Sequence, residues 1–204
     1  MINMKEVSLL NMHKILRFAL LLLSLPLHAS AQSISGAWPA LHPETGRPNI
    51  RNYSPKEYGA MPQNWAIIQD QRGVMYFGNW NGVLEYDGVT WRLIPTPNKS
   101  GVRSFAMDEH GRLYVGAVGD LGYLAPDSLG QLQFVSLLDH VAQEGRGFNE
   151  VWYTYATSQG VYFGTDRMLL RWDGSRMRSW KASTLFSRLF MVRDRIFLRQ
   201  WDVG

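Results

Sequence analysis

A short pattern of residues recurs along this chain, and it limits the possible folds more than any other feature. Each copy has a glycine, one or two further residues, a tyrosine, an apolar residue and a second glycine. The copies lie at 73–78, 111–116 and 160–164, with a weaker fourth copy at 195–198. Their aromatic anchors, which are 38, 48 and 35 residues apart, are Tyr76, Tyr114, Tyr162 and Phe197. A period of about 40 residues built from short strands predicts a β-propeller in which each repeat is one blade.

Each repeat also divides into short strand-like runs separated by turn residues. Asp70-Gln-Arg-Gly73 is a turn with glycine at the position that needs a positive φ, and Asp87-Gly88 is a strong hairpin signal. The strands of the first blade are predicted at 65–68, 74–77, 82–86 and 90–94, and the inner strand of the third blade at 150–155. The blades are predicted at approximately 63–97, 101–138, 148–182 and 185–204. Residues 137–148 are expected to hold a short helix between the second and third blades.

The predicted fold class is therefore all-β, a propeller of four-stranded antiparallel blades with about three and a half blades in residues 63–204. Propellers typically close with four to eight blades, so we expect a fragment of a larger propeller of about seven blades. An unclosed propeller exposes one blade face and one unpaired strand edge, and both promote association. We expect residues 32–204 expressed alone to aggregate or oligomerise.

Residues 1–31 have the pattern of a secretory signal peptide. Lys14 and Arg17 precede an apolar run at 18–27, and Ala29-Ser30-Ala31 is a small-residue cleavage site, with cleavage expected after Ala31. The apolar run is far shorter than the roughly 20 residues that span a bilayer. We expect a periplasmic or otherwise extracytoplasmic protein with no membrane span apart from this segment. An uncleaved anchor helix is the alternative.

Residues 32–62 differ in composition from the repeats. They contain five of the nine prolines and no regular alternation, which predicts an extended N-terminal segment. Its only strand-like piece is 50–53. Propellers commonly close by pairing an N-terminal strand with the last blade, and this piece is a candidate for that role.

Charge excludes one class of partner. Without residues 1–31 the chain has 18 Lys and Arg against 16 Asp and Glu, and these charges are scattered. A nearly neutral chain without a basic cluster gives no support to binding of nucleic acid or of an anionic membrane. The chain has no cysteine, which excludes disulfides and a lipid attached to cysteine.

One position in the repeat is the first candidate for ligand binding. Alignment of the blades on their glycines places Trp65, Arg103 and Trp152 at equivalent positions near the start of each inner strand. In a propeller this end of the strand lies around the central channel. Two tryptophans and an arginine suit the face of a sugar ring together with a carboxylate or hydroxyl group. The alternative interpretation is that Trp65 and Trp152 pack between blades.

A second candidate is the loop Asn79-Trp80-Asn81 between two strands of the first blade. A tryptophan flanked by amides resembles a platform for carbohydrate, although a packed loop tip fits the same residues. The aspartates that precede turn glycines by three residues raise the question of calcium. Calcium needs six to eight converging oxygens, whereas Asp70, Asp108 and Asp127 lie on separate hairpins, so turn capping is the favoured interpretation.

Other site chemistry is not indicated. The histidines have no metal-ligand spacing, so we expect no metal site and no cofactor. The glycines at 116–122 resemble a phosphate loop only superficially, because they connect two strands and no helix follows. No nucleophile elbow and no catalytic cysteine are present, and we expect no catalytic residue in this segment.

The repeat resembles that of the two-component regulator propeller family. Its pattern is Asp-x-x-Gly, a short spacer, an aromatic and an apolar residue with glycine, and then Gly-Leu-x-x-Tyr-Asp-Gly. The similar stretches are 53–58, 63–65, 78–88, 102–105, 114–117 and 119–123. The turn Thr157-Ser-Gln-Gly160 departs from the pattern because it lacks the aspartate. The resemblance covers roughly residues 48–200.

The resemblance implies a propeller in the bacterial periplasm, in many cases in Bacteroidetes. In that family a small β-sandwich, a membrane-spanning helix and a cytoplasmic output module follow. The output is a histidine kinase, a nucleotide cyclase or a helix-turn-helix regulator, so whether the full-length protein is an enzyme stays open.

The leading functional hypothesis is the extracytoplasmic, non-catalytic ligand-sensing propeller of a bacterial two-component-type receptor. Its expected partners are a carbohydrate or other small molecule and a second receptor copy. One alternative is a secreted lyase-like propeller enzyme whose catalytic residues lie in further blades. Another is an envelope scaffold for protein complexes, which exposed hydrophobic patches would favour.

Overall fold

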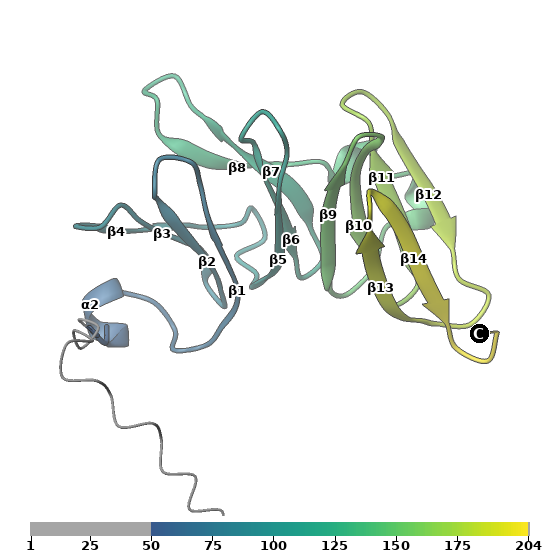
Figure 1. Ribbon diagram of the computed structural model, residues 1–204, viewed down its shortest axis with the longest axis horizontal. Coiled ribbons are helices and arrows are strands. Elements are labelled where there is room, and N and C mark those ends of the chain that lie inside the picture. The colour runs from purple at the N-terminus through teal and green to yellow at the C-terminus, as the bar shows by residue number, and fades with distance from the viewer. Residues whose placement is uncertain (1–49, 204) are drawn as a thin grey trace, which may run out of the picture. The chain divides into compact units, whose positions relative to one another are not determined.

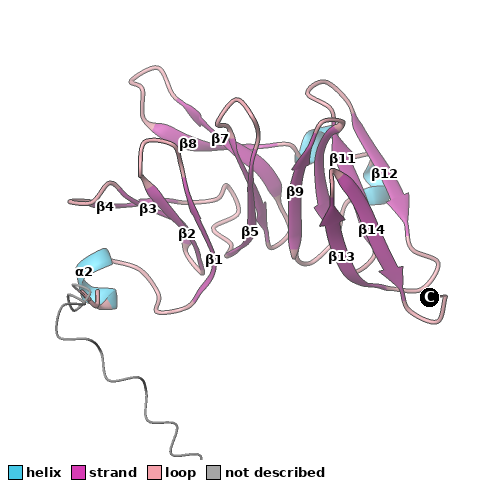
Figure 2. Cartoon of the chain, viewed as in Figure 1, coloured by secondary structure: helices cyan, strands magenta, loops and turns pink. Residues whose placement is uncertain are grey.

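A computed structural model describes residues 50–203 of the chain. Strands dominate this part, and the helical elements in it are each no longer than one turn (Figure 2). The strands form three four-stranded antiparallel sheets and one two-stranded sheet, each built from consecutive strands. The fold class is therefore an all-β propeller with three four-stranded blades and a two-stranded fourth (Figure 1). Among the described residues, no helix is long and apolar enough to cross a membrane.

Each blade is a meander that starts at its inner strand. The first blade comprises β1 (Asn64–Gln69), β2 (Met75–Asn79), β3 (Gly82–Tyr86) and β4 (Trp91–Ile94). The second comprises β5 (Val102–Met107), β6 (Leu113–Ala117), β7 (Leu121–Pro126) and β8 (Leu132–Ser136). The third comprises β9 (Tyr153–Thr157), β10 (Gly160–Gly164), β11 (Met168–Trp172) and β12 (Met177–Lys181), and the fourth β13 (Phe186–Val192) and β14 (Arg195–Gln200). The inner strands β1, β5 and β9 lie side by side (Figure 1).

The strands predicted for the first blade agree with β1–β4 to within two residues at each end, whereas the inner strand of the third blade starts later than predicted. Glu150 forms an isolated antiparallel bridge with Val118 of the preceding blade, and β9 begins only at Tyr153. The predicted helix between these blades is present as two short 3-10 turns, Leu138–His140 and Gln143–Gly145.

Aspartates cap the turns between the first two strands of the first and second blades, as the sequence predicts. In the first blade Asp70 Oδ1 accepts backbone N–H groups from Arg72 and Val74, at 2.9 and 3.0 Å. Asp108 makes the same pair of bonds in the second blade, with His110 and Arg112. Gly73 closes the first of these turns with φ at 87°, a value that glycine adopts at little cost. The carboxylates are thus used locally, one for each hairpin.

The apolar core lies between neighbouring blades. Tyr76 of the first blade is buried with Val102 and Val115 of the second blade in one cluster. Tyr114, which occupies the equivalent position in the second blade, is buried with Phe163 of the third blade in another cluster. Burial of a large apolar side chain contributes about 1.5–3 kcal/mol, so these repeated contacts between blades are the main source of stability.

The N-terminal segment is attached to the first blade by aromatic side chains. Residues 50–53 form no strand, and a short helix, α2 (Pro55–Tyr58), follows them. The rings of Tyr53 and Tyr58 lie 5.2 and 5.5 Å from the ring of Trp91 on β4. Tyr53 thus packs on the outer strand of the first blade through its side chain, and the pairing of 50–53 with a last blade stays a prediction.

Candidate functional site

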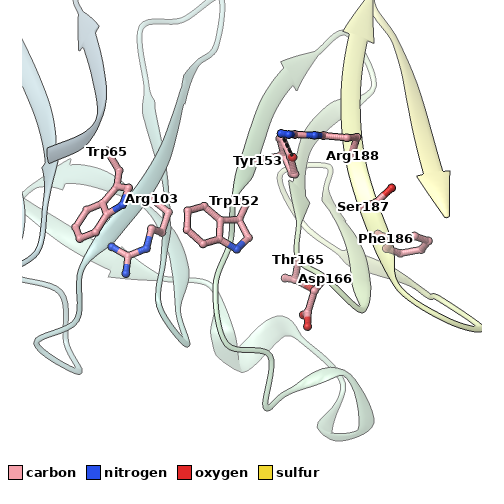
Figure 3. Close-up of a pocket in the computed structure, with 9 residues that line it drawn as sticks. All are labelled: Trp65, Arg103, Trp152, Tyr153, Thr165, Asp166, Phe186, Ser187 and Arg188. Carbon is pink, nitrogen blue, oxygen red and sulfur yellow. Dashed lines mark hydrogen bonds between the residues drawn. The ribbon is translucent and has the colours of Figure 1, made fainter. Parts of the chain in front are cut away.

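One residue from each blade occupies the same place at the start of the inner strand. Trp65 and Arg103 both lie where the pairing of the first two strands shifts register, in β1 and β5. Ser187 lies at the same kind of shift in β13. Trp152 directly precedes Tyr153, which pairs with Gly164 as Ser104 pairs with Gly116. The four residues line a single cavity of about 560 Å³, part of which Figure 3 shows.

Arg103 is the central residue of this cavity. Its guanidinium carbon lies 3.6 Å from the ring centroid of Trp65, and Figure 3 shows the group between Trp65 and Trp152. The distances to the rings of Trp80 and Trp152 are 5.2 and 5.5 Å. A cation over an aromatic face is attracted by the ring quadrupole, most strongly for tryptophan and when desolvated. Three tryptophans thus hold the arginine in place.

The charge of Arg103 is balanced by the third blade. Its Nε donates to Glu150 Oε1 at 2.8 Å, and the side chain of Arg103 is only 4% exposed. Its Nη1 is buried and has no hydrogen-bond partner within residues 50–203. A Cβ at Gly101 would lie 2.9 Å from this nitrogen, so the glycine makes room for the guanidinium group. The pair joins the second blade to the third directly beneath the tryptophans.

In the loop Asn79-Trp80-Asn81 the two asparagines bond to the N-terminal segment, whereas the tryptophan ring is exposed beside the cavity. Asn79 is fully buried, and its Nδ2 donates to the carbonyl oxygens of Met61 and Gln63. Asn81 Oδ1 accepts from the Met61 N–H at 2.9 Å. Both asparagines therefore fasten the N-terminal segment to the first blade. Trp80 is 48% exposed, and its ring centroid lies 5.5 Å from that of Trp65, beside the cavity.

The other side of the cavity is polar and was not predicted from the sequence. It is formed by Tyr153, Thr165, Asp166, Phe186, Ser187 and Arg188. Thr165 is buried, and its hydroxyl accepts from the Met168 N–H in the turn after β10, so its role is structural. Arg188 donates to the Tyr153 hydroxyl at 3.4 Å. The glycine-based alignment did not reach Ser187 and its neighbours on β13, because the fourth repeat has Arg199 where the others have glycine.

The clear pKa shifts lie outside this cavity. Burial raises the pKa of Tyr76 to about 12 in the core between the first two blades. Burial also raises the pKa of Asp120, which accepts from the Ser136 hydroxyl at 2.6 Å. Hydrogen bonds from the backbone N–H and hydroxyl of Thr90 lower the pKa of Asp87 to about 2. These groups serve the fold rather than the candidate site.

Metal-binding side chains do not gather anywhere in the described part of the chain. Residues 50–203 contain no group of three or more His, Cys, Asp and Glu side chains placed to hold a metal ion. The cavity instead offers aromatic faces, a caged guanidinium and a small set of polar side chains. Such a site can hold a ring-shaped molecule by stacking and hydrogen bonding.

Proteins similar to this chain are found among the solved structures. No protein-family model and no curated protein matches the sequence. The chain is similar to the extracellular domain of a putative hybrid two component system from B. thetaiotaomicron, with 18% identity and a TM-score of 0.48 over 67% of this chain and 20% of that one. It is also similar to virginiamycin B lyase from Staphylococcus aureus, with 12% identity and a TM-score of 0.47 over 71% of this chain and 59% of that one. The chain thus spans a fifth of the length of the first structure and about three fifths of the second.

Proposed function

We propose that this chain is the ligand-sensing propeller of an extracytoplasmic receptor of the two-component regulator propeller type. The signal peptide pattern and the repeat motifs support the location and the family. The observation that carries the sensing role is the cavity to which each of the four blades contributes one equivalent residue. Its ligand is a small molecule with a ring face, of which a carbohydrate is the first class to test.

The exposed aromatic rings beside the cavity support a ring-shaped ligand. Trp65 is already stacked on Arg103, but Trp152 and Trp80 remain 44% and 48% exposed. Stacking on such faces tolerates many rings, and polar groups beside them supply selectivity. The three tryptophans around Arg103 also disfavour a cationic ligand there, because the protein's own guanidinium group occupies the space between them.

A ligand in this cavity would affect how the blades sit against one another. The Arg103–Glu150 pair links the second and third blades, and the Ser104 hydroxyl donates to the Val151 carbonyl at 2.7 Å just below it. A ligand that contacts several blades favours the spacing that fits it best, and it shifts the receptor only by its difference in affinity between two states. In a receptor dimer this preference would change the association of the two copies.

Tryptophan fluorescence tests the binding role directly. The purified full chain is titrated with a panel of neutral and acidic mono- and disaccharides, alongside Trp152→Ala and Trp180→Ala. Trp180 is a matched control because it is also 44% exposed but lies on β12, outside this cavity. We expect saturable binding that Trp152→Ala weakens by at least about tenfold and Trp180→Ala leaves unchanged. Absence of binding, or equal loss in both variants, would remove the sensing role from this cavity.

A further inference from the structure

We infer that the cavity selects a ligand that has both a positive and a negative group, with Asp166 and Arg188 as the residues that determine this specificity. The inference rests on the proposed function and narrows it to one class of ligand. Asp166 follows β10 in the third blade, and Arg188 lies on β13 in the fourth. Both line the cavity, and the sequence pattern singled out neither of them.

The two side chains have opposite charges, and within the described residues neither forms an ion pair; Arg188 is exposed to solvent and Asp166 is partly exposed. Within residues 50–203, Arg188 makes no ion pair, and its one side-chain hydrogen bond goes to the neutral Tyr153 hydroxyl. The Asp166 backbone carbonyl accepts from the Phe186 N–H, but its carboxylate has no hydrogen-bond or ion-pair partner in the same part of the chain. By contrast, Arg103 is already paired with Glu150. The uncompensated charges of the cavity are therefore one carboxylate and one guanidinium group.

The placement of these charges suits a ring held between aromatic walls. In Figure 3, Trp152 and Phe186 lie on opposite sides of the cavity, with Arg188 and Tyr153 toward one end and the Asp166 carboxylate toward the other. A ring between Trp152 and Phe186 would place one substituent near each charge. An ammonium group on the Asp166 side and a carboxylate on the Arg188 side would each form an ion pair with the protein.

Desolvation is the physical reason for selectivity. A ligand that fills the cavity displaces water from both charged groups, and an uncompensated charge removed from water is costly. A neutral ring leaves both Asp166 and Arg188 without a charged partner. A ligand with one charge leaves one of the two residues unpaired. In a site of this kind, a ligand that lacks one of the two charges loses more affinity than the doubly charged ligand gains.

Four pyranose sugars test the contributions of the positive and the negative ligand group separately. Muramic acid has an ammonium and a carboxylate group, N-acetylmuramic acid only the carboxylate, glucosamine only the ammonium, and glucose neither. Binding to the purified full chain is measured by isothermal titration calorimetry at pH 7. We expect muramic acid to bind at least about tenfold more tightly than each of the other three, since hydrogen bonds to charged groups are the stronger ones.

Two substitutions assign the charges to the residues. Asp166→Asn is expected to remove the preference for muramic acid over N-acetylmuramic acid, and Arg188→Gln the preference over glucosamine. The matched controls, Glu144→Gln and Arg178→Gln, change exposed charges outside the cavity and should keep both preferences. Thermal unfolding of each variant shows that it is folded.

The outcomes distinguish this inference from the proposed function. If glucose or a singly charged probe binds as tightly as muramic acid, the selectivity for two charges is wrong while the cavity remains a carbohydrate site. The same conclusion follows if the two cavity variants keep both preferences. If none of the four probes binds at millimolar concentration, both the selectivity and the carbohydrate-sensing role are wrong.

Discussion

At the scale of single residues, Arg103 determines the character of the site. The sequence aligned it with Trp65 and Trp152 as one candidate ligand site, and the structure adds that the rings of both tryptophans lie around the arginine itself. Periodicity identifies the shared position, whereas the stacking depends on the approach of neighbouring blades, which a single sequence does not contain. The sequence also suggested Asn79 and Asn81 as ligand contacts, because a single sequence does not show that both bond to the N-terminal segment.

We predict that Arg103→Met lowers the free energy of unfolding by about 1–3 kcal/mol, through loss of the cation–π contacts and of the hydrogen bond to Glu150. Glu150 is partly exposed, so its remaining charge is partly solvated and the loss stays below that of a fully buried pair. Urea denaturation measures the change. Arg178→Met, on an exposed position of β12, should shift the value by less than about 0.5 kcal/mol. Equal effects would mean that the cage around Arg103 contributes nothing.

At the scale of elements, turn chemistry and alternation were the most informative signals. Aspartate and glycine at the first and last hairpins of the first blade predicted where their strands end and begin, because the carboxylates of Asp70 and Asp87 accept from backbone N–H groups of the turn and Gly73 and Gly88 adopt positive φ. The fourth blade was predicted from its weaker repeat, because it lacks the Asp-x-x-Gly turn: Arg193 and Asp194 adopt positive φ before β14 instead. Residues 50–53 form no strand in the structure, and Tyr53 packs against Trp91.

The hairpin between β3 and β4 should respond to acid. Because the pKa of Asp87 falls to about 2 in the folded chain, its contribution is complete above about pH 4 and is lost as the pH falls toward 2. We predict that Asp87→Ala is less stable than the natural chain at pH 7 and that the two converge near pH 2. Chemical denaturation at a series of pH values measures this difference. Glu144→Ala serves as the control, and a difference that does not change with pH would contradict the prediction.

At the scale of the described molecule, one face of the fourth blade is uncovered. Phe197 occupies the repeat position of Tyr76 and Tyr114, which the following blade buries, yet it is 48% exposed. Phe190, its cross-strand partner, is 52% exposed on the same face. On the opposite face of this blade, Leu189 is buried against the third blade. The uncovered face therefore has the composition of a contact between blades.

We predict that residues 32–204 expressed alone self-associate through this face. Sedimentation velocity over a range of concentrations should show species larger than a monomer, and Phe197→Lys should shift them toward monomer because it places a charge in the contact. Val89→Lys, on an exposed turn of the first blade, is the control. If unsubstituted residues 32–204 are monomeric at all concentrations, the exposed face of the fourth blade does not drive association and the prediction is wrong.

Hydrogen exchange measured by mass spectrometry tests whether residues from four blades form one ligand site. The full chain is compared with and without the tightest-binding saccharide of the panel. We predict slower exchange on binding in peptides that contain the starts of all four inner strands, at 64–66, 102–104, 152–154 and 186–188. Protection confined to one blade, or to the turns at 108–111 and 157–160 at the opposite ends of these strands, would contradict it.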